Sequence, residues 1–220
     1  MKQVVLFCGL GTSGKDFWAN KVAEIYRSER PSQKVVFIGI SQARKQYWGK
    51  SEDMTDADHL LKNEITLLEI KKQFIINGVD VVIANMTMLT QSAHQLPFMR
   101  MISETELLMC RKLREQKARQ SRIPLEAIEF KLVNINLSVF WMTCDEATSI
   151  KRLTSRRKGL DQTGGGLVTI SEFRKGQHGF EPPGNYYPFV KIDTSDESPQ
   201  ADFAREQVIR SYILTRKRRQ

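Results

Sequence analysis

The sequence lacks the long apolar runs that mark membrane proteins. No stretch reaches the roughly 18 consecutive apolar residues of a membrane-spanning helix. The N-terminal MKQVVLFCGLG is too short, and its glycines come too early, for a signal peptide. We therefore expect a soluble cytoplasmic protein with no membrane partner.

Cysteine and histidine are also scarce. Cys8, Cys110 and Cys144 are odd in number and lack metal-ligand spacing, and two of them end predicted strands, where a thiol behaves as a small apolar group. The three histidines share no metal-binding spacing either. We assign the cysteines no chemistry and the histidines ordinary surface or capping roles.

The overall composition is that of a globular protein with an excess of positive charge. The chain has 220 residues, of which 40% are hydrophobic and 27% charged, and this favours one domain over residues 1–220. The net charge of +9 favours an anionic partner such as a nucleotide, a nucleic acid or another phosphorylated molecule. The basic tail at 216–220 is either a contact for nucleic acid or a solvated chain end.

Apolar runs alternate with amphipathic segments along the chain. The runs predict strands at 4–8, 34–40, 80–85, 134–144 and 186–194. The amphipathic segments predict helices at 14–30, at 55–80 with Asp56 as N-cap and Gly78 as stop, and within 93–130, either as one helix or as two helices broken at 119–124. Pro124 suits the start of the second of these. The alternation predicts an α/β fold with a doubly wound parallel sheet.

The turn between the first strand and the first helix has the spacing of a phosphate-binding loop. Backbone N–H groups of residues 11 to 16 can converge there on phosphate oxygens, and Lys15 can reach the outer phosphates. The alternative is a purely structural glycine turn. The predicted nucleotide-binding residues are Gly9, Gly11, Thr12, Ser13, Gly14, Lys15 and Asp16.

Asp16 is a departure from this pattern, because such loops commonly carry Ser or Thr there to contact Mg²⁺. A carboxylate can bind Mg²⁺, but it also brings negative charge close to the phosphates. The third strand ends with Ala84 and Asn85, where related loops often carry an Asp on the magnesium side. We hypothesise that Asp16 relocates that carboxylate and is the metal ligand.

Several motifs together resemble a known family. GLGTSGKD, FIINGVDVVIANMT, CDEATSIKRLTSRRKG and ISEF...HGFEPP...FVKIDTS occur in the order seen in P-loop kinases similar to polynucleotide 5′-hydroxyl kinases and zeta-toxin-like kinases. The resemblance covers most of residues 2 to 215. It implies a core of five parallel strands, ATP with Mg²⁺, and transfer of the γ-phosphoryl group to a hydroxyl. The SGKDF variant is also similar to loops of some phosphomevalonate kinases and phage deoxynucleotide kinases.

Three arginines match catalytic positions of such kinases. Arg152 and Arg156 match arginines of a mobile lid, here at about 152–183, and they lie four residues apart on a predicted helix, so both can clamp the migrating phosphoryl group. The alternative is a solvated basic helix end. A glycine triplet at 164–166 and a short helix around 169–176 are expected within the lid. Arg44 is implied to grip the acceptor's phosphate, or else is a surface residue.

The other acceptor-side residues are less well defined. Asn85 and Thr87 either position the acceptor or a magnesium-bound water, or cap a turn. Ser41 stands where polynucleotide-kinase-like enzymes usually carry the Asp that accepts the hydroxyl proton. Positioning and electrostatics can still do most of the work, because phosphoryl transfer has a loose transition state. Three carboxylates lie downstream as possible bases: Asp53, Asp56 and Asp58.

Two further features bear on nucleic acid. Segment 110–122 within the helical insertion at 93–130 is rich in Lys and Arg, and it either tracks a phosphate backbone or is a solvated helix face. Tyr47 and Trp48 are candidates for stacking on a base. The leading interpretation is an ATP-dependent kinase acting on a nucleic-acid end, a nucleotide or a nucleotide-sugar. The alternatives are a nucleotide-binding regulator without catalysis and a toxin-like kinase of amino-sugar nucleotides.

Overall fold

Five parallel strands form one sheet in the order β2-β3-β1-β4-β5. The computed structural model describes residues 2–48, 54–88, 90–157, 169–184 and 186–215. Its strands are β1 (Lys2–Cys8), β2 (Val35–Gly39), β3 (Val81–Met86), β4 (Ile135–Thr143) and β5 (Phe189–Asp193). Its helices are α1 (Lys15–Glu29), α2 (Ile40–Tyr47), α3 (Asp56–Ile75), η2 (Gln91–Gln95), α4 (Leu96–Ser121), η3 (Leu125–Ala127), α5 (Glu146–Arg157), α6 (Ile170–His178) and α7 (Pro199–Thr215).

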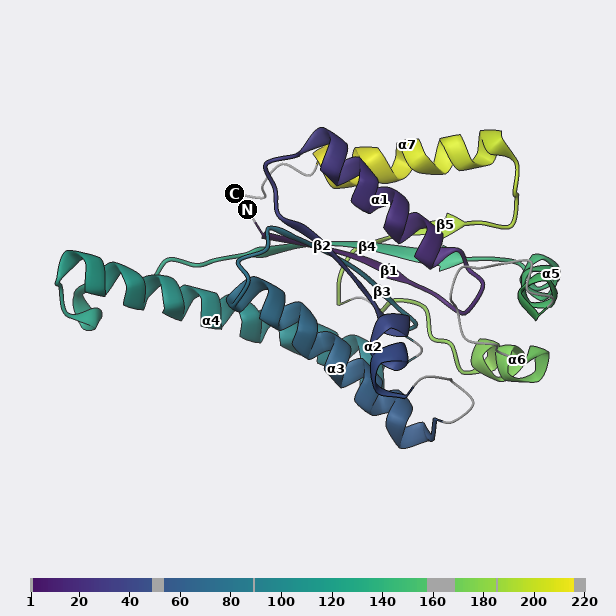
Figure 1. Cartoon of the computed structure of the whole chain (residues 1–220), viewed down its shortest axis with the longest axis horizontal. Coiled ribbons are helices and arrows are strands. Elements are labelled where there is room, and N and C mark those ends of the chain that lie inside the picture. Colours follow the sequence, from purple (N-terminus) through teal and green to yellow (C-terminus); the bar gives the residue numbers. More distant parts are fainter. Residues whose placement is uncertain (1, 49–53, 89, 158–168, 185, 216–220) are drawn as a thin grey trace.

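Helices cover both faces of the sheet, as the alternating pattern predicted (Figure 1). α1 and α7 pack on one face, where Val22 and Ile209 are buried against Phe7. α3 and α4 pack on the other, where Ile70 and Phe98 join a second apolar cluster. The central strand β1 is apolar on both faces because both are covered. The doubly wound, five-stranded α/β fold is confirmed.

The crossovers bring the carboxyl ends of all strands to one edge of the sheet. The loop after β1, the start of α2 and the end of β3 therefore meet there, while α5 and α6 lie beside the same edge (Figure 1). None of the described helices combines the length and the apolar character needed to cross a bilayer.

Several helix boundaries differ from the expectation. The second strand ends at Gly39 and α2 begins at once, since the Asn85 side chain accepts the N–H of Ile40 at 3.1 Å and supplies the new helix with a partner. The N-cap of α3 is Thr55 rather than Asp56, and it forms a capping box with Asp58.

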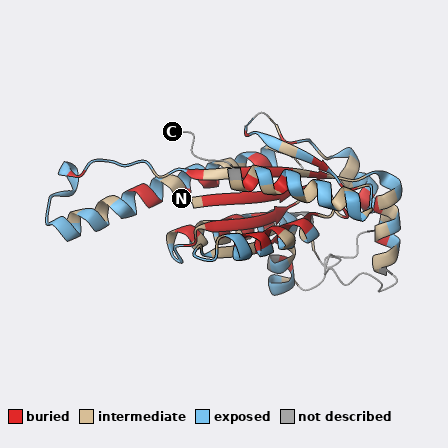
Figure 2. Cartoon of the chain, turned by 90° about the horizontal axis from the view of Figure 1, so that it is seen from above, coloured by how far each residue is buried: buried red, intermediate tan, exposed pale blue. Residues whose placement is uncertain are grey.

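The helical insertion is mostly one helix rather than two. α4 runs without a break to Ser121, and Pro124 precedes only a three-residue turn, η3. The second half of α4 extends beyond the sheet, and its side chains there are largely exposed (Figures 1 and 2). α7 was not predicted, because its buried face rests on few apolar residues, among them Ile209 and Ile213. Gly78, at φ 64°, lies just past the end of α3 as expected.

Candidate active site

The loop between β1 and α1 is held open by two glycines. A Cβ on Gly9 would lie 2.3 Å from the carbonyl oxygen of Met142, so no side chain fits there. Gly14 has a φ of 77°, the left-handed region that glycine favours, and it precedes the first residue of α1. Both glycines are therefore required by the shape of the loop.

The backbone carbonyls and the backbone N–H groups of this loop differ in whether they have hydrogen-bond partners. The carbonyls of residues 10 to 14 all accept hydrogen bonds from protein groups: Leu10 from Ser13 and Lys15, Gly11 from Thr12, Thr12 from Arg152, Ser13 from Thr194, and Gly14 from Trp18. The N–H groups of residues 11, 12 and 14 to 16 donate to no acceptor in the described part of the chain. A loop whose carbonyl acceptors are already hydrogen-bonded, and whose N–H donors are available, is suited to binding an anion.

Lys15 lies inside this loop. Its side chain is buried, and its ammonium donates to the carbonyl of Leu10 at 3.0 Å. Burial lowers the pKa of Lys15, while the charge of Asp16 opposes this effect and the charge of Arg156 adds to it. A bound anion would raise the pKa of Lys15 again, because its negative charge would compensate the positive charges of Lys15 and Arg156.

Asp16 contacts the end of β3. The side-chain amide of Asn85 donates to Oδ1 of Asp16, and its own carbonyl oxygen accepts the N–H of Ile40. The second carboxylate oxygen of Asp16 has no hydrogen-bond or ion-pair partner among the described residues. Asn85 therefore joins the loop of residues 9–14, called the phosphate loop after the function that the sequence predicts for it, to the end of β3 and the start of α2.

Arg152 has a different environment from the one expected for a lid arginine. Its guanidinium donates to the carbonyl of Thr12 at 2.8 Å, to the hydroxyl and carbonyl of Thr194 at 3.1 and 2.7 Å, and to Glu197 at 3.1 Å. The sulfur of Cys144 is a further contact at 3.3 Å. Arg152 thus links the phosphate loop to the end of β5. Its hydrogen bonds hold the loop in position.

Arg156 lies one helical turn further along α5, near Lys15, whose pKa its charge lowers. α6 covers the other side of the loop: Phe173 is buried, and a Cβ on Gly176 would lie 3.6 Å from the side chain of Leu10. The expected short helix at 169–176 is confirmed as α6. Much of the predicted lid, including glycines 164–166, lies outside the described residues, as does the tail at 216–220.

Arg44, which the family resemblance assigns to the acceptor, lies on α2. Arg44 is buried, and its charge acts on Lys62 of α3, which packs beside α2. Ser41 lies one turn earlier on α2, and Thr87 follows β3; both are partly buried. Arg44 and Lys62 therefore extend the positive charge of Lys15 from the phosphate loop toward α2 and α3.

Sequence reasoning missed Lys62. Burial and the charges of Arg44 and Lys15 lower the pKa of Lys62 to about 8, and its ammonium lies 3.2 Å from Nδ1 of His59. The charge of Lys62 in turn lowers the pKa of His94, after the larger effect of burial. The signal in the sequence is that two polar residues near Lys62, Asn63 and Thr66, fall on the face of α3 that otherwise buries apolar side chains.

No carboxylate of the described residues has an environment typical of a general base near α2. Asp58 accepts from the indole of Trp48 at 2.9 Å and from Thr55, and these hydrogen bonds hold its pKa below the usual range. Asp53 and the side chain of Asp56 lie outside the described residues. Tyr47 is exposed and in edge contact with Trp48.

The residues present fit a nucleotide with Mg²⁺. The loop offers N–H donors and a buried ammonium to phosphates, and Asp16 offers one carboxylate oxygen to a metal ion. Mg²⁺ is commonly held by one or two carboxylates together with substrate phosphates and water. Among the described residues, no group of three or more His, Cys, Asp or Glu side chains is placed to hold a metal ion.

Comparison with known proteins identifies the fold. No family model and no curated protein matches the chain. A solved sugar kinase from Janibacter sp. HTCC2649 is similar to it with a TM-score of 0.56 at 12% identity, over 97% of this chain and 95% of that one. Kti12 from Chaetomium thermophilum, solved in complex with ADP-AlF3, has a TM-score of 0.52 at 14% identity, over 95% of this chain and 98% of that one. The chain therefore has the α/β fold that these two proteins share.

Proposed function

We propose that the protein is an ATP- and Mg²⁺-dependent kinase that transfers the γ-phosphoryl group to a hydroxyl of a phosphate-bearing acceptor, a nucleotide-like molecule or a nucleic-acid end. The observation that carries this proposal is the hydrogen bonding of the phosphate loop: the carbonyls of residues 10 to 14 accept from protein groups, while the N–H groups of residues 11, 12 and 14 to 16 have no acceptor among the described residues. Support comes from the fold, which is shared with a sugar kinase and with a protein solved with ADP-AlF3.

Each nucleotide-site residue has a distinct role in this proposal. The loop from Gly9 to Gly14 and Lys15 would bind the phosphates, and Asp16 would hold Mg²⁺. Arg156 would stabilise charge on the migrating phosphoryl group, which is the usual task of an arginine in this chemistry. Arg152 would act through the loop that it holds in place. Bound ATP and Mg²⁺ would supply the phosphoryl group and neutralise its charge.

The cationic side chains beside the loop favour an anionic acceptor. Arg44 and Lys62 place positive charge on α2 and α3, and the charge of Arg44 lowers the pKa of Lys62. An acceptor with its own phosphate would relieve this repulsion. Asn85 and Thr87, at the end of β3, would orient the acceptor hydroxyl.

A transfer assay tests the proposal. Purified protein is incubated with γ-labelled ATP, Mg²⁺ and a panel of 5′-hydroxyl oligonucleotides, nucleoside monophosphates and UDP-sugars. Label on at least one phosphate-bearing acceptor is expected, and Lys15→Ala should abolish it, whereas Lys72→Ala, at an exposed position on α3, should not.

A regulator without catalysis is the second candidate. It is favoured by Ser41 and by the lack of a general base among the described carboxylates near α2. Binding of ATP by calorimetry, together with no transfer to any acceptor in the panel, would select it over the kinase.

A further inference from the structure

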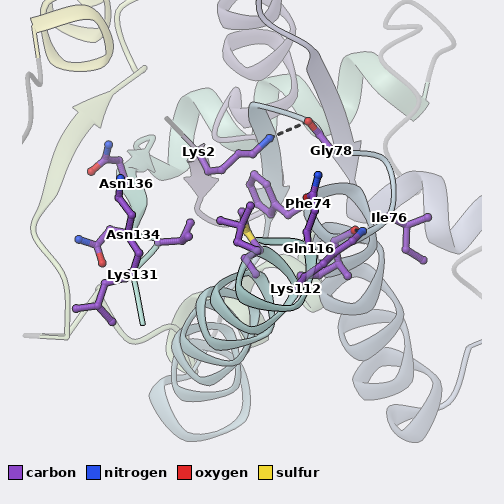
Figure 3. A pocket seen from close by; sticks show the side chains of 14 residues that line it. Lys2, Phe74, Ile76, Gly78, Lys112, Gln116, Lys131, Asn134 and Asn136 are labelled. Atoms are coloured by element: carbon purple, nitrogen blue, oxygen red, sulfur yellow. Dashed lines mark hydrogen bonds between the residues drawn. The ribbon is translucent and has the colours of Figure 1, made fainter. Parts of the chain in front are cut away.

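A pocket lies at the opposite edge of the sheet from the phosphate loop. Its volume is about 740 Å³, and it is bounded by the end of α3, by residues 109–116 of α4 and by the starts of β1 and β4 (Figure 3). The phosphate loop follows the other end of β1, a strand of seven residues that spans roughly 20 Å. This pocket is therefore separate from the candidate active site.

The pocket combines an apolar interior with amide and ammonium groups. Figure 3 shows Phe74 within it and the amides of Gln116, Asn134 and Asn136 along its sides. The residues that line it include three lysines and no acidic residue. Two of these lysines are anchored near the carboxyl end of α3. Lys112 donates to the carbonyl of Ile75, and Lys2 donates to the carbonyls of Gly78 and Val79 and pairs with Asp80 at 3.2 Å.

A basic helix leads out of this pocket. Lys112 and Gln116 both line it, and the same face of α4 continues toward Arg119, with Lys117 beside it. Residues 110–122 contain six Lys or Arg and one Glu, and that Glu115 is paired with Arg111. Lys117 and Arg119 are exposed and have no ion-pair partner among the described residues.

Residues 126–133, which follow α4 in the chain, hold the projecting part of this helix in place. Arg114 donates to the carbonyls of Ile128 and Glu126, and the sulfur of Cys110 accepts the N–H of Val133. The cations of α4 are therefore presented on a supported arm (Figures 1 and 2). We define the arm as residues 110–134.

We propose that the arm and its pocket bind single-stranded nucleic acid, with phosphates along α4 and an unpaired base in the pocket. A row of six cations with a single Glu among them suits a repeating phosphate backbone. Amide side chains can hydrogen-bond base edges, and an apolar floor can take the face of a base. An acidic protein would pair with the cations of α4, but this pairing would not account for the amide side chains in the pocket. This inference does not depend on phosphoryl transfer.

Fluorescence anisotropy with a labelled single-stranded RNA of about 20 nucleotides tests the inference. The double variant Lys117→Glu/Arg119→Glu should weaken binding by about tenfold or more and lower the salt dependence, by about 0.7 in log–log slope for each lost phosphate contact. The matched control Arg100→Glu/Lys175→Glu reverses one Arg and one Lys elsewhere on the surface and should bind as the wild type does. Circular dichroism checks that both variants are folded.

The pocket is tested separately. Leu132 is 72% exposed at its rim, so Leu132→Asp should fold normally and weaken the single-stranded RNA. Duplex RNA of the same sequence should bind more weakly than the single strand. Equal loss in the two double variants would reduce the effect to net charge and overturn the inference. So would an acidic polypeptide that binds where RNA does not, or a loss with Lys62→Met as large as that of the arm variant, which would place the RNA at the acceptor side.

Discussion

The side-chain amide of Asn85, at the end of β3, donates a hydrogen bond to the carboxylate of Asp16, in the first turn of α1. These residues are 69 positions apart in the chain, and the pairing of β1 with β3 brings them together. The contact agrees with the hypothesis that Asp16 supplies the carboxylate that related loops carry at the end of the third strand. It leaves one oxygen of Asp16 for a metal ion.

Asp16→Asn should remove the magnesium dependence of ATP binding. The neutral amide is a poorer ligand for Mg²⁺, so we expect affinity in the presence of Mg²⁺ to fall by about tenfold or more, equivalent to about 1.4 kcal/mol. Affinity in EDTA should stay the same or rise. Isothermal titration calorimetry measures both, with the exposed Glu24→Gln of the same helix as control. An unchanged magnesium dependence would contradict relocation of the carboxylate.

Asn85→Asp should destabilise the metal-free protein in a pH-dependent way. Two carboxylates would replace an amide and its acceptor, and their repulsion would raise the pKa of the pair above the unfolded values. The folded state would then bind more protons than the unfolded state, so stability would be lost as the pH rises through the raised pKa. Thermal unfolding at pH 5 and pH 8 checks this, and added Mg²⁺ should restore the melting temperature. A deficit that is the same at both pH values would argue against contact with Asp16.

Lys15→Met should stabilise the ligand-free protein while abolishing nucleotide binding. Burial of the ammonium lowers the pKa of Lys15 below 10.5, so its charge opposes folding. A rise in melting temperature of about 3 °C would correspond to roughly 1 kcal/mol in a chain of this size. Because the folded state binds fewer protons at Lys15 than the unfolded state, the advantage of the variant should shrink as the pH rises toward 10.5. Nucleotide binding that survives would relocate the site.

Lys62 should set the pH dependence of acceptor use. Its pKa of about 8 means that the ammonium is largely present at pH 7 and largely lost at pH 9. We expect kcat/KM for a phosphate-bearing acceptor to fall by about tenfold per pH unit above this pKa in the wild type. Lys62→Arg should keep its activity at pH 9, since a guanidinium stays protonated. Lys62→Met should have a low kcat/KM that does not change across this pH range. A wild-type profile unchanged in Lys62→Met would remove Lys62 from acceptor binding.

Arg152 and Arg156 should separate in kinetic analysis. Arg152→Lys cannot reproduce the contacts with Thr12 and Thr194, so the loop should loosen, and both thermal stability and nucleotide affinity should fall. Arg156→Lys should leave ADP affinity and melting temperature nearly unchanged and lower kcat by about 100-fold or more. The reverse assignment would result if Arg152→Lys changed kcat alone.

The sequence by itself determined the alternation of strands and helices, the parallel sheet and the position of the phosphate loop. Apolar periodicity and glycine spacing are properties of neighbouring residues, so they can be interpreted without knowing how the chain crosses over. The start of α2 at Ile40 escaped this reasoning, because its first N–H group is satisfied by Asn85 from another strand. α7 escaped it too, since few of its side chains are buried.

Only the tertiary structure decided which side chains meet. It paired Asp16 with Asn85, bound Arg152 to the loop that it was expected to serve from a lid, and placed Lys62 near Lys15. It also directed the basic half of α4 away from the phosphate loop, to the opposite edge of the sheet. These outcomes depend on strand order and on the direction of each crossover, which join residues far apart in the chain and leave no mark in any local pattern.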